Sequence, residues 1–148
     1  MPVQHATIEV EQLVRADVGS VWSAYADPVT RARWSVPAGE AMSIDHDDLR
    51  DGGAGRYRCG EPGVLPFTGV VGYVRVVPGK LVVQTETVHA GDELLASALV
   101  TWRFRAHEDQ TLVSIVDQVT SFVGEGMIEG HRNGHRLALE QLAQHLAG

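Results

Sequence analysis

"EGHRNGHRLALEQLAQHLAG", residues 129–148, closes the chain and predicts its longest helix. At 100° per residue, one arc of roughly 100° holds the apolar side chains, two histidines and the preceding isoleucine. These residues are Ile128, His131, His135, Ala138, Leu139, Leu142 and Leu146. Arg132, Asn133 and Arg136 fall outside the arc. We therefore expect both histidines to face the protein interior, and the helix to cover an apolar surface.

The rest of the chain predicts that surface. An alternating, β-branched stretch predicts a strand over about His5–Val14, and two short helices follow, with Asp17 as an N-cap and Pro28 opening the second. About six strands joined by short turns come next, and such strands pair antiparallel. The expected fold is α+β, a single domain over residues 1–148, with the long helix lying across the concave face of a curved sheet.

Two of these strands alternate clearly enough to assign their faces. Ala98, Val100, Trp102 and Phe104 share one face, and Val113, Ile115, Asp117 and Val119 share another. If the second face is the concave one, Asp117 interrupts an apolar row and can reach a helix histidine. Gln84 and Thr85 point to opposite faces of their strand, so at most one of them is inward.

Composition excludes several classes of function. A net charge of −7 disfavours binding to nucleic acid or to an anionic membrane, and no apolar run could span a bilayer. The single cysteine, Cys59, fits a reducing compartment, and no signal peptide is visible. We expect a soluble, cytoplasmic protein, with a homodimer left open. Arg31, Arg33, Arg50, Arg56 and Arg58 are scattered along the chain, and we expect them to be solvated.

Several short motifs occur in the order and spacing of a known superfamily. They include Asp27-Pro28 before Arg33-Trp34, "DLRDGG" at residues 48–53, Gly69 in "FTGVV", "PGKLV" at 78–82, "VTWRF" at 100–104, and the final L-x-x-L of Leu139 and Leu142. Together they resemble the START, or birch-pollen-allergen-like, superfamily of polyketide cyclases and ligand-binding proteins. The branch they are most similar to is the C-terminal domain of the heat-shock-protein-90 ATPase activator.

The resemblance implies a helix-grip fold, in which the sheet wraps the long helix and encloses a cavity. It covers nearly the whole chain, but such a fold does not name a substrate. Relatives usually carry H-x-x-G-W before the last L-x-x-L, whereas this chain has His135 in the tryptophan position. We expect more room and a titratable group at the cavity wall. Gly134, in mid-helix, costs roughly 1 kcal/mol relative to alanine and predicts a bend or a close approach of another segment.

Three interpretations of His131 and His135 follow. As metal ligands they need a third partner, and Asp117 is the only acidic residue expected to face inward nearby. Because this ligand set is incomplete, we predict no metal and no cofactor. As acid and base they would work with Asp117, as cyclase or dehydratase chemistry requires. As wall residues they would only be hydrogen-bonded.

We favour binding of a small apolar or aromatic molecule, with the acid–base enzyme as the alternative and a chaperone-associated protein–protein module as the third. The expected contact residues are Trp34, Tyr57, Val100, Trp102, Phe104, Ile115, Asp117, His131 and His135.

Overall fold

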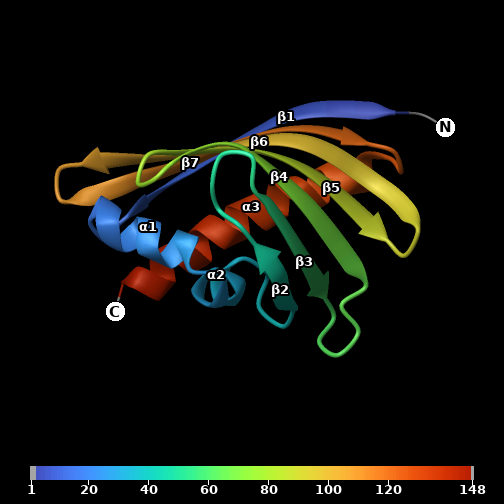
Figure 1. Ribbon diagram of the computed structural model, residues 1–148, viewed down its shortest axis with the longest axis horizontal. Helices are drawn as coiled ribbons and strands as arrows, with labels where there is room; N and C mark the ends of the chain where they lie inside the picture. Colours follow the sequence, from blue (N-terminus) through green and yellow to red (C-terminus); the bar gives the residue numbers. More distant parts are fainter. Residues whose placement is uncertain (1–2, 148) are drawn as a thin grey trace.

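The computed structural model describes residues 3–147 and contains one seven-stranded antiparallel sheet with three helices. The strands are β1 (Gln4–Val14), β2 (Ala41–Asp47), β3 (Ala54–Gly60), β4 (Phe67–Val77), β5 (Leu81–Ala90), β6 (Glu93–His107) and β7 (Gln110–Ser121). Their order in the sheet is β1-β7-β6-β5-β4-β3-β2. The helices are α1 (Val18–Ala26), α2 (Pro28–Trp34) and α3 (Glu125–Leu146). The sheet curves, and α3 runs across its concave side (Figure 1). This is the predicted α+β helix-grip arrangement.

Aspartate side chains cap both short helices, and only the first of these caps was predicted from the sequence. The Asp17 carboxylate accepts hydrogen bonds from the backbone N–H and the hydroxyl of Ser20 and so caps α1. Asp27 ends α1 and caps α2 in the same way through Thr30, and Pro28 occupies the first turn of α2. Both caps satisfy backbone donors that a helix start leaves free. The chain therefore turns sharply between two helices without a linker.

The long helix is held in place at both ends. Gly124 precedes it with a φ of 102°, a conformation that residues with a side chain rarely adopt, and the Ser121 hydroxyl donates to the Gly124 carbonyl at 2.6 Å. Near the other end, the Gln141 amide donates to the carbonyls of Trp34 and Val36 at 2.8 and 2.6 Å. These bonds fix α3 relative to the sheet and to α2. The side chains of Ile128, Ala138, Leu139 and Leu142 are buried beneath it, as the helical stripe predicts.

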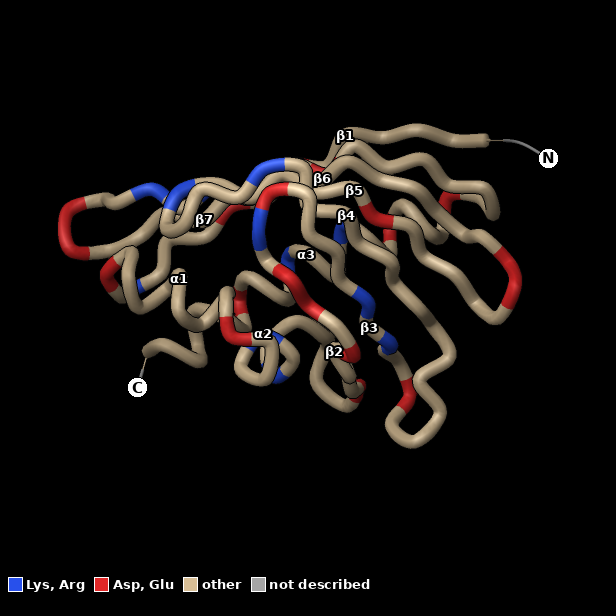
Figure 2. Tube along the Cα trace, viewed as in Figure 1, with Lys and Arg blue, Asp and Glu red and all other residues tan. Residues whose placement is uncertain are grey.

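Alternation along β6 and β7 sets the inner face of the sheet. Val100, Trp102 and Phe104 are buried in β6, and Ile115 and Asp117 are buried in β7, on the faces predicted from their spacing. Lys and Arg are interspersed with Asp and Glu along the described chain (Figure 2). No helix within residues 3–147 is long and apolar enough to cross a membrane.

Candidate functional site

A pocket of about 540 Å³ lies between α3 and the concave side of the sheet. The apolar side chains that line it include Trp34, Met42, Ile44, Phe67, Val71, Val88, Val100, Trp102, Met127 and Leu137. Gly130 and Gly134 line it from α3, and a Cβ built on either would meet nothing within 4 Å. The close approach of another segment suggested for Gly134 is therefore wrong. The two glycines instead leave the pocket wide on the helix side.

The polar cluster at the α3 wall joins the two predicted histidines to one carboxylate. His131 Nδ1 lies 3.0 Å from Asp117 Oδ2, and His135 Nε2 lies 2.7 Å from the same oxygen. Asp117 comes from the middle of β7, paired to Ile8 of β1 on one side and to Val100 of β6 on the other. Its side chain is fully buried, while the two histidines are 11% and 19% exposed and line the pocket. The histidines therefore stand between the carboxylate and the pocket.

Charge in this cluster is divided between its members. Burial acts to raise the pKa of Asp117, but the hydrogen bonds and charges of the two histidines outweigh it and hold that pKa below its ordinary value. Burial acts to lower the pKa of His131, but its hydrogen bond to Asp117 and the charges of Asp117 and Glu86 hold it above its ordinary value. Asp117 therefore stays ionised and favours the imidazolium form of His131.

Glu86 is a second acidic residue at this wall, and it was not predicted from the sequence. It lines the pocket from β5, and its Oε2 accepts a hydrogen bond from the Tyr57 hydroxyl at 3.1 Å. Burial raises the pKa of both groups. The expectation that Asp117 is the only inward acid nearby is therefore wrong. The signal was the alternation of β5, which places Glu86 on the same face as Gln84, the inward member of the Gln84–Thr85 pair.

Gly69 of the "FTGVV" motif makes room for this tyrosine. Gly69 pairs with Tyr57 across β3 and β4, and a Cβ at Gly69 would lie 1.8 Å from Tyr57 Cε2. The tyrosine ring therefore lies over the glycine, which brings its hydroxyl to Glu86. Cys59, two residues along β3, also lines the pocket, and burial raises the pKa of its thiol to about 11. That thiol stays protonated at neutral pH and is a poor nucleophile.

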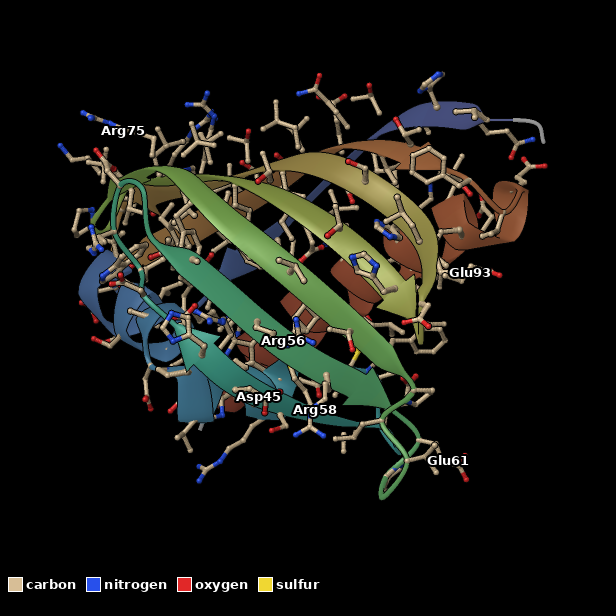
Figure 3. The ribbon with its side chains drawn as sticks, turned by 45° about the vertical axis from the view of Figure 1, so that its right-hand side comes forward. Asp45, Arg56, Arg58, Glu61, Arg75 and Glu93 are labelled. Atoms are coloured by element: carbon tan, nitrogen blue, oxygen red, sulfur yellow. The ribbon has the colours of Figure 1, made fainter. Side chains whose placement is uncertain are left out.

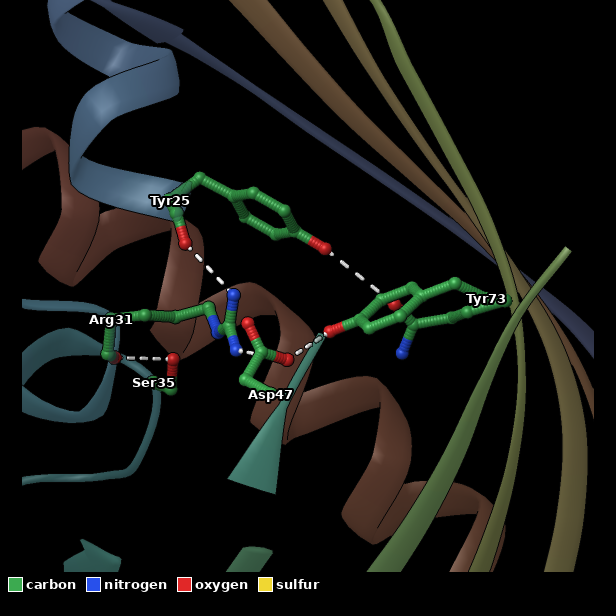
Figure 4. A network of polar contacts seen from close by, with 6 residues as sticks. Tyr25, Arg31, Ser35, Asp47 and Tyr73 are labelled. Atoms are coloured by element: carbon green, nitrogen blue, oxygen red, sulfur yellow. Dashed lines mark hydrogen bonds and ion pairs between the residues drawn. The ribbon is translucent and has the colours of Figure 1, made fainter. Parts of the chain in front are cut away.

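A second polar network, centred on Arg31 and Asp47, lines the pocket (Figure 4). Arg31 of α2 contacts Asp47 of β2 at 3.0 Å and donates to the Tyr25 carbonyl at 2.9 Å. The Tyr73 hydroxyl donates to Asp47 Oδ1, the same oxygen that Arg31 contacts, at 2.5 Å. Only 12% of the Arg31 side chain and 4% of the Asp47 side chain are exposed. Arg31 is therefore a buried pocket residue, and its expected solvation is wrong.

Comparison with known proteins assigns the chain to a family. The model of the family described as AHSA1, Activator of Hsp90 ATPase homolog 1-like protein, matches residues 15–147. The chain belongs to the AHSA1 family. No curated protein matches the chain in sequence.

Solved structures share the fold of this AHSA1 family member. A protein from Rhizobium leguminosarum superposes with a TM-score of 0.85 at 21% identity, over 99% of this chain and 97% of that one. The Mll3558 protein from Rhizobium loti gives 0.84 at 26% identity, over 97% and 99%. DynU16, a protein of the dynemicin biosynthetic locus, gives 0.72 at 18% identity, over 95% of this chain and 47% of its own.

Most of the expected contact residues come together in this AHSA1 fold. Trp34, Tyr57, Val100, Trp102, His131 and His135 line the pocket, and Asp117 lies directly behind the histidines. The structure does not bring Phe104 or Ile115 to the pocket. Phe104 packs in the core against Trp22 of α1 with ring centroids 5.3 Å apart, and Ile115 is fully buried beside Trp102 in the sheet. Alternation placed both on the inner face but could not indicate which part of that face the helices cover.

Proposed function

We propose that this protein binds a small, largely apolar molecule in the pocket between α3 and the sheet. The observation that carries the proposal is the pocket itself, whose volume of about 540 Å³ is lined mainly by apolar and aromatic side chains with two separate polar groups. Small-molecule sites are typically concave, mostly apolar and furnished with a few placed polar groups. AHSA1 family membership is consistent with ligand binding.

The charges at the wall favour a neutral ligand over an ionised one. Arg31 is already paired with Asp47, so it offers little net attraction to an anion. Glu86 and the buried Asp117 place negative charge near the histidines. The groups that remain for recognition are hydrogen-bonding ones, including the free edges of the two imidazole rings and the amide of Gln84. An apolar or aromatic body bearing hydroxyl or carbonyl groups fits this wall.

A titration with the neutral fluorophore N-phenyl-1-naphthylamine tests the proposal. Its fluorescence rises in apolar surroundings, and we expect saturable binding of one probe per chain. In G134L, a leucine enters the pocket from α3 at a position where a Cβ meets nothing within 4 Å, and we expect affinity to fall at least about tenfold, since filling the pocket removes the buried contact area of the probe. G126L is the matched control, because Gly126 is exposed on the same helix and is equally free of neighbours.

Two results would overturn ligand binding in this pocket. One is the absence of saturable fluorescence from the folded wild-type protein. The other is equal binding by wild type, G134L and G126L, which would locate the probe elsewhere. Near-ultraviolet circular dichroism of all three proteins checks that binding is not to a loosely packed state, which also takes up apolar dyes.

We infer acid–base catalysis as a second candidate, because both histidines contact Asp117 and also line the pocket. A carboxylate fixes the orientation of an imidazole and stabilises its protonated form, as general-base catalysis requires. The corresponding reaction is removal of a proton from a carbon next to a carbonyl. Chaperone docking, the third expectation from the sequence, stays a prediction.

Hydrogen–deuterium exchange at carbon tests this second candidate. The aromatic ketone 2-tetralone exchanges the protons beside its carbonyl, and NMR in D₂O follows the rate. We expect the wild-type protein to accelerate exchange above buffer, and H135A and H131A to lower the rate by about 100-fold or more, the usual range for a lost general base. Exchange equal to that in buffer, or unchanged in both variants, would exclude the reaction for this ketone, while the fluorophore titration still reports binding.

A further inference from the structure

We propose that Asp117, His131 and His135 form a binding site for one divalent transition-metal ion at the wall of the pocket. No metal was predicted from the sequence, because periodicity does not establish that Asp117 reaches the two histidines. The structure shows that it does. Asp117 Oδ2, His131 Nδ1 and His135 Nε2 all lie within 4.8 Å of one another, with contacts of 3.0 and 2.7 Å to the shared oxygen.

The two contacts to Asp117 Oδ2 are close to the spacing of ligand atoms around a metal ion. Zinc lies about 2.0–2.2 Å from carboxylate oxygen and imidazole nitrogen, so ligand atoms around a tetrahedral ion are roughly 3.3 Å apart. The two observed contacts to Asp117 Oδ2 are a few tenths of an ångström shorter, a difference that small rotations of the side chains can remove. Nδ1 and Nε2 are both ordinary ligand atoms of neutral histidine.

A second observation points to a cation at the same place. Asp117 is fully buried, and among the described residues its Oδ1 has no hydrogen-bond partner. A buried carboxylate normally has its oxygens satisfied, because leaving one unpaired in a low-dielectric site costs free energy. Both histidine ring nitrogens contact Oδ2, and neither of them contacts Oδ1. A divalent ion beside the carboxylate would compensate its charge more fully than these two donors do.

The ligand types select the class of metal. Two imidazoles and one carboxylate suit zinc, iron, cobalt, nickel or copper, whereas calcium and magnesium prefer oxygen ligands alone. Three protein ligands leave at least one position of the ion open. Since both histidines line the pocket, that position faces the pocket, where water or an oxygen of a bound molecule can occupy it. Glu86, held by Tyr57, is a further acid that lines the pocket.

Calorimetric titration of metal-free protein with ZnCl₂ at pH 7.5 tests the site. We expect one Zn²⁺ per chain, and no comparable binding of Mg²⁺ or Ca²⁺. Loss of a ligand in H131A or H135A should weaken Zn²⁺ binding by more than about 100-fold, beyond what loss of an outer contact typically causes. H135W is a second variant at the same position and installs the residue that relatives usually carry, so it separates loss of the ligand from loss of folding.

His145 gives the matched control, because it is exposed on the same helix and lies outside the cluster. H145A should bind Zn²⁺ like the wild type. Titration with Co²⁺ adds a spectroscopic readout, since low coordination numbers give strong visible absorption that H131A and H135A should lose. Absence of Zn²⁺ binding to the folded wild-type protein would overturn the proposal, and so would equal binding by the wild type, H131A and H135A.

Discussion

The buried ion pair between Arg31 and Asp47 provides the sharpest test of the packing around the pocket. Both side chains are almost completely shielded, with exposed fractions of 12% and 4%, and the Tyr73 hydroxyl is bonded to the same carboxylate. In D47A the guanidinium of Arg31 keeps its hydrogen bond to the Tyr25 carbonyl but loses its counter-charge. We therefore expect this substitution to be strongly destabilising.

The expected magnitude follows from the cost of an unpaired buried charge. Removing one partner of a buried ion pair costs about 3–5 kcal/mol, whereas replacing both partners by apolar residues is often neutral. For a chain of this length, 1 kcal/mol corresponds to a shift of about 2–4 °C in Tm, so D47A should lower Tm by about 6–20 °C. The double variant R31M/D47L should recover most of that loss.

Urea unfolding followed by circular dichroism measures the effect, with midpoint and slope fitted separately. D45A is the matched control. Asp45 is also on β2 and also pairs with an arginine, Arg58 on β3, but both side chains are half-exposed, so the loss should be small (Figure 3). Equal midpoints for D47A and D45A would refute the argument. So would a double variant as unstable as D47A, because the cost would then not arise from the unpaired charge.

Three further predictions concern the histidine side of the pocket. G69A should lower the free energy of unfolding by about 1–3 kcal/mol, because its Cβ would overlap the Tyr57 ring. G134A, where a Cβ meets no neighbour, should raise the free energy of unfolding by up to about 1 kcal/mol. Urea midpoints that shift in the same direction for both variants would contradict this. E86Q should raise the free energy of unfolding at pH 7 but not at pH 3.5. Burial raises the pKa of Glu86, so its ionised form destabilises the folded protein only at pH values above the ordinary pKa of 4.5. With EDTA present, the Asp117–His131 contact should stabilise the fold most between about pH 4 and 6.5. Because the pKa of Asp117 is lowered in the folded protein, this stability is lost as pH falls below 3.8 towards the folded value. Because the pKa of His131 is raised, the stability is also lost as pH rises above 6.5 through the folded value. Urea unfolding from pH 3 to 9 should show a loss of stability on the alkaline side for wild type relative to H131Q, and parallel profiles would count against the assigned contact.

Local patterns in the sequence determined the elements and the relative faces of their residues. A helix repeats every 3.6 residues and a strand every two, so the stripe holding His131 and His135 and the row holding Asp117 could be read directly. Side chains that bond backbone N–H groups at a helix start act within one turn, so the cap at Asp17 and the start of α2 at Pro28 were also visible in the sequence. The expected helix-grip fold followed from the order of these elements and from the family resemblance.

Only the tertiary structure decided which residues meet. The position of β7 between β1 and β6, and the line along which α3 crosses the sheet, bring Asp117 to both histidines. Periodicity fixes which residues of one element share a face, but not which elements face each other or which part of a face they cover. For that reason Glu86 and Arg31 were missed, and Phe104 was expected at the pocket although α1 covers it. Contacts between residues distant in sequence depend on the packing of whole elements, which no local pattern encodes.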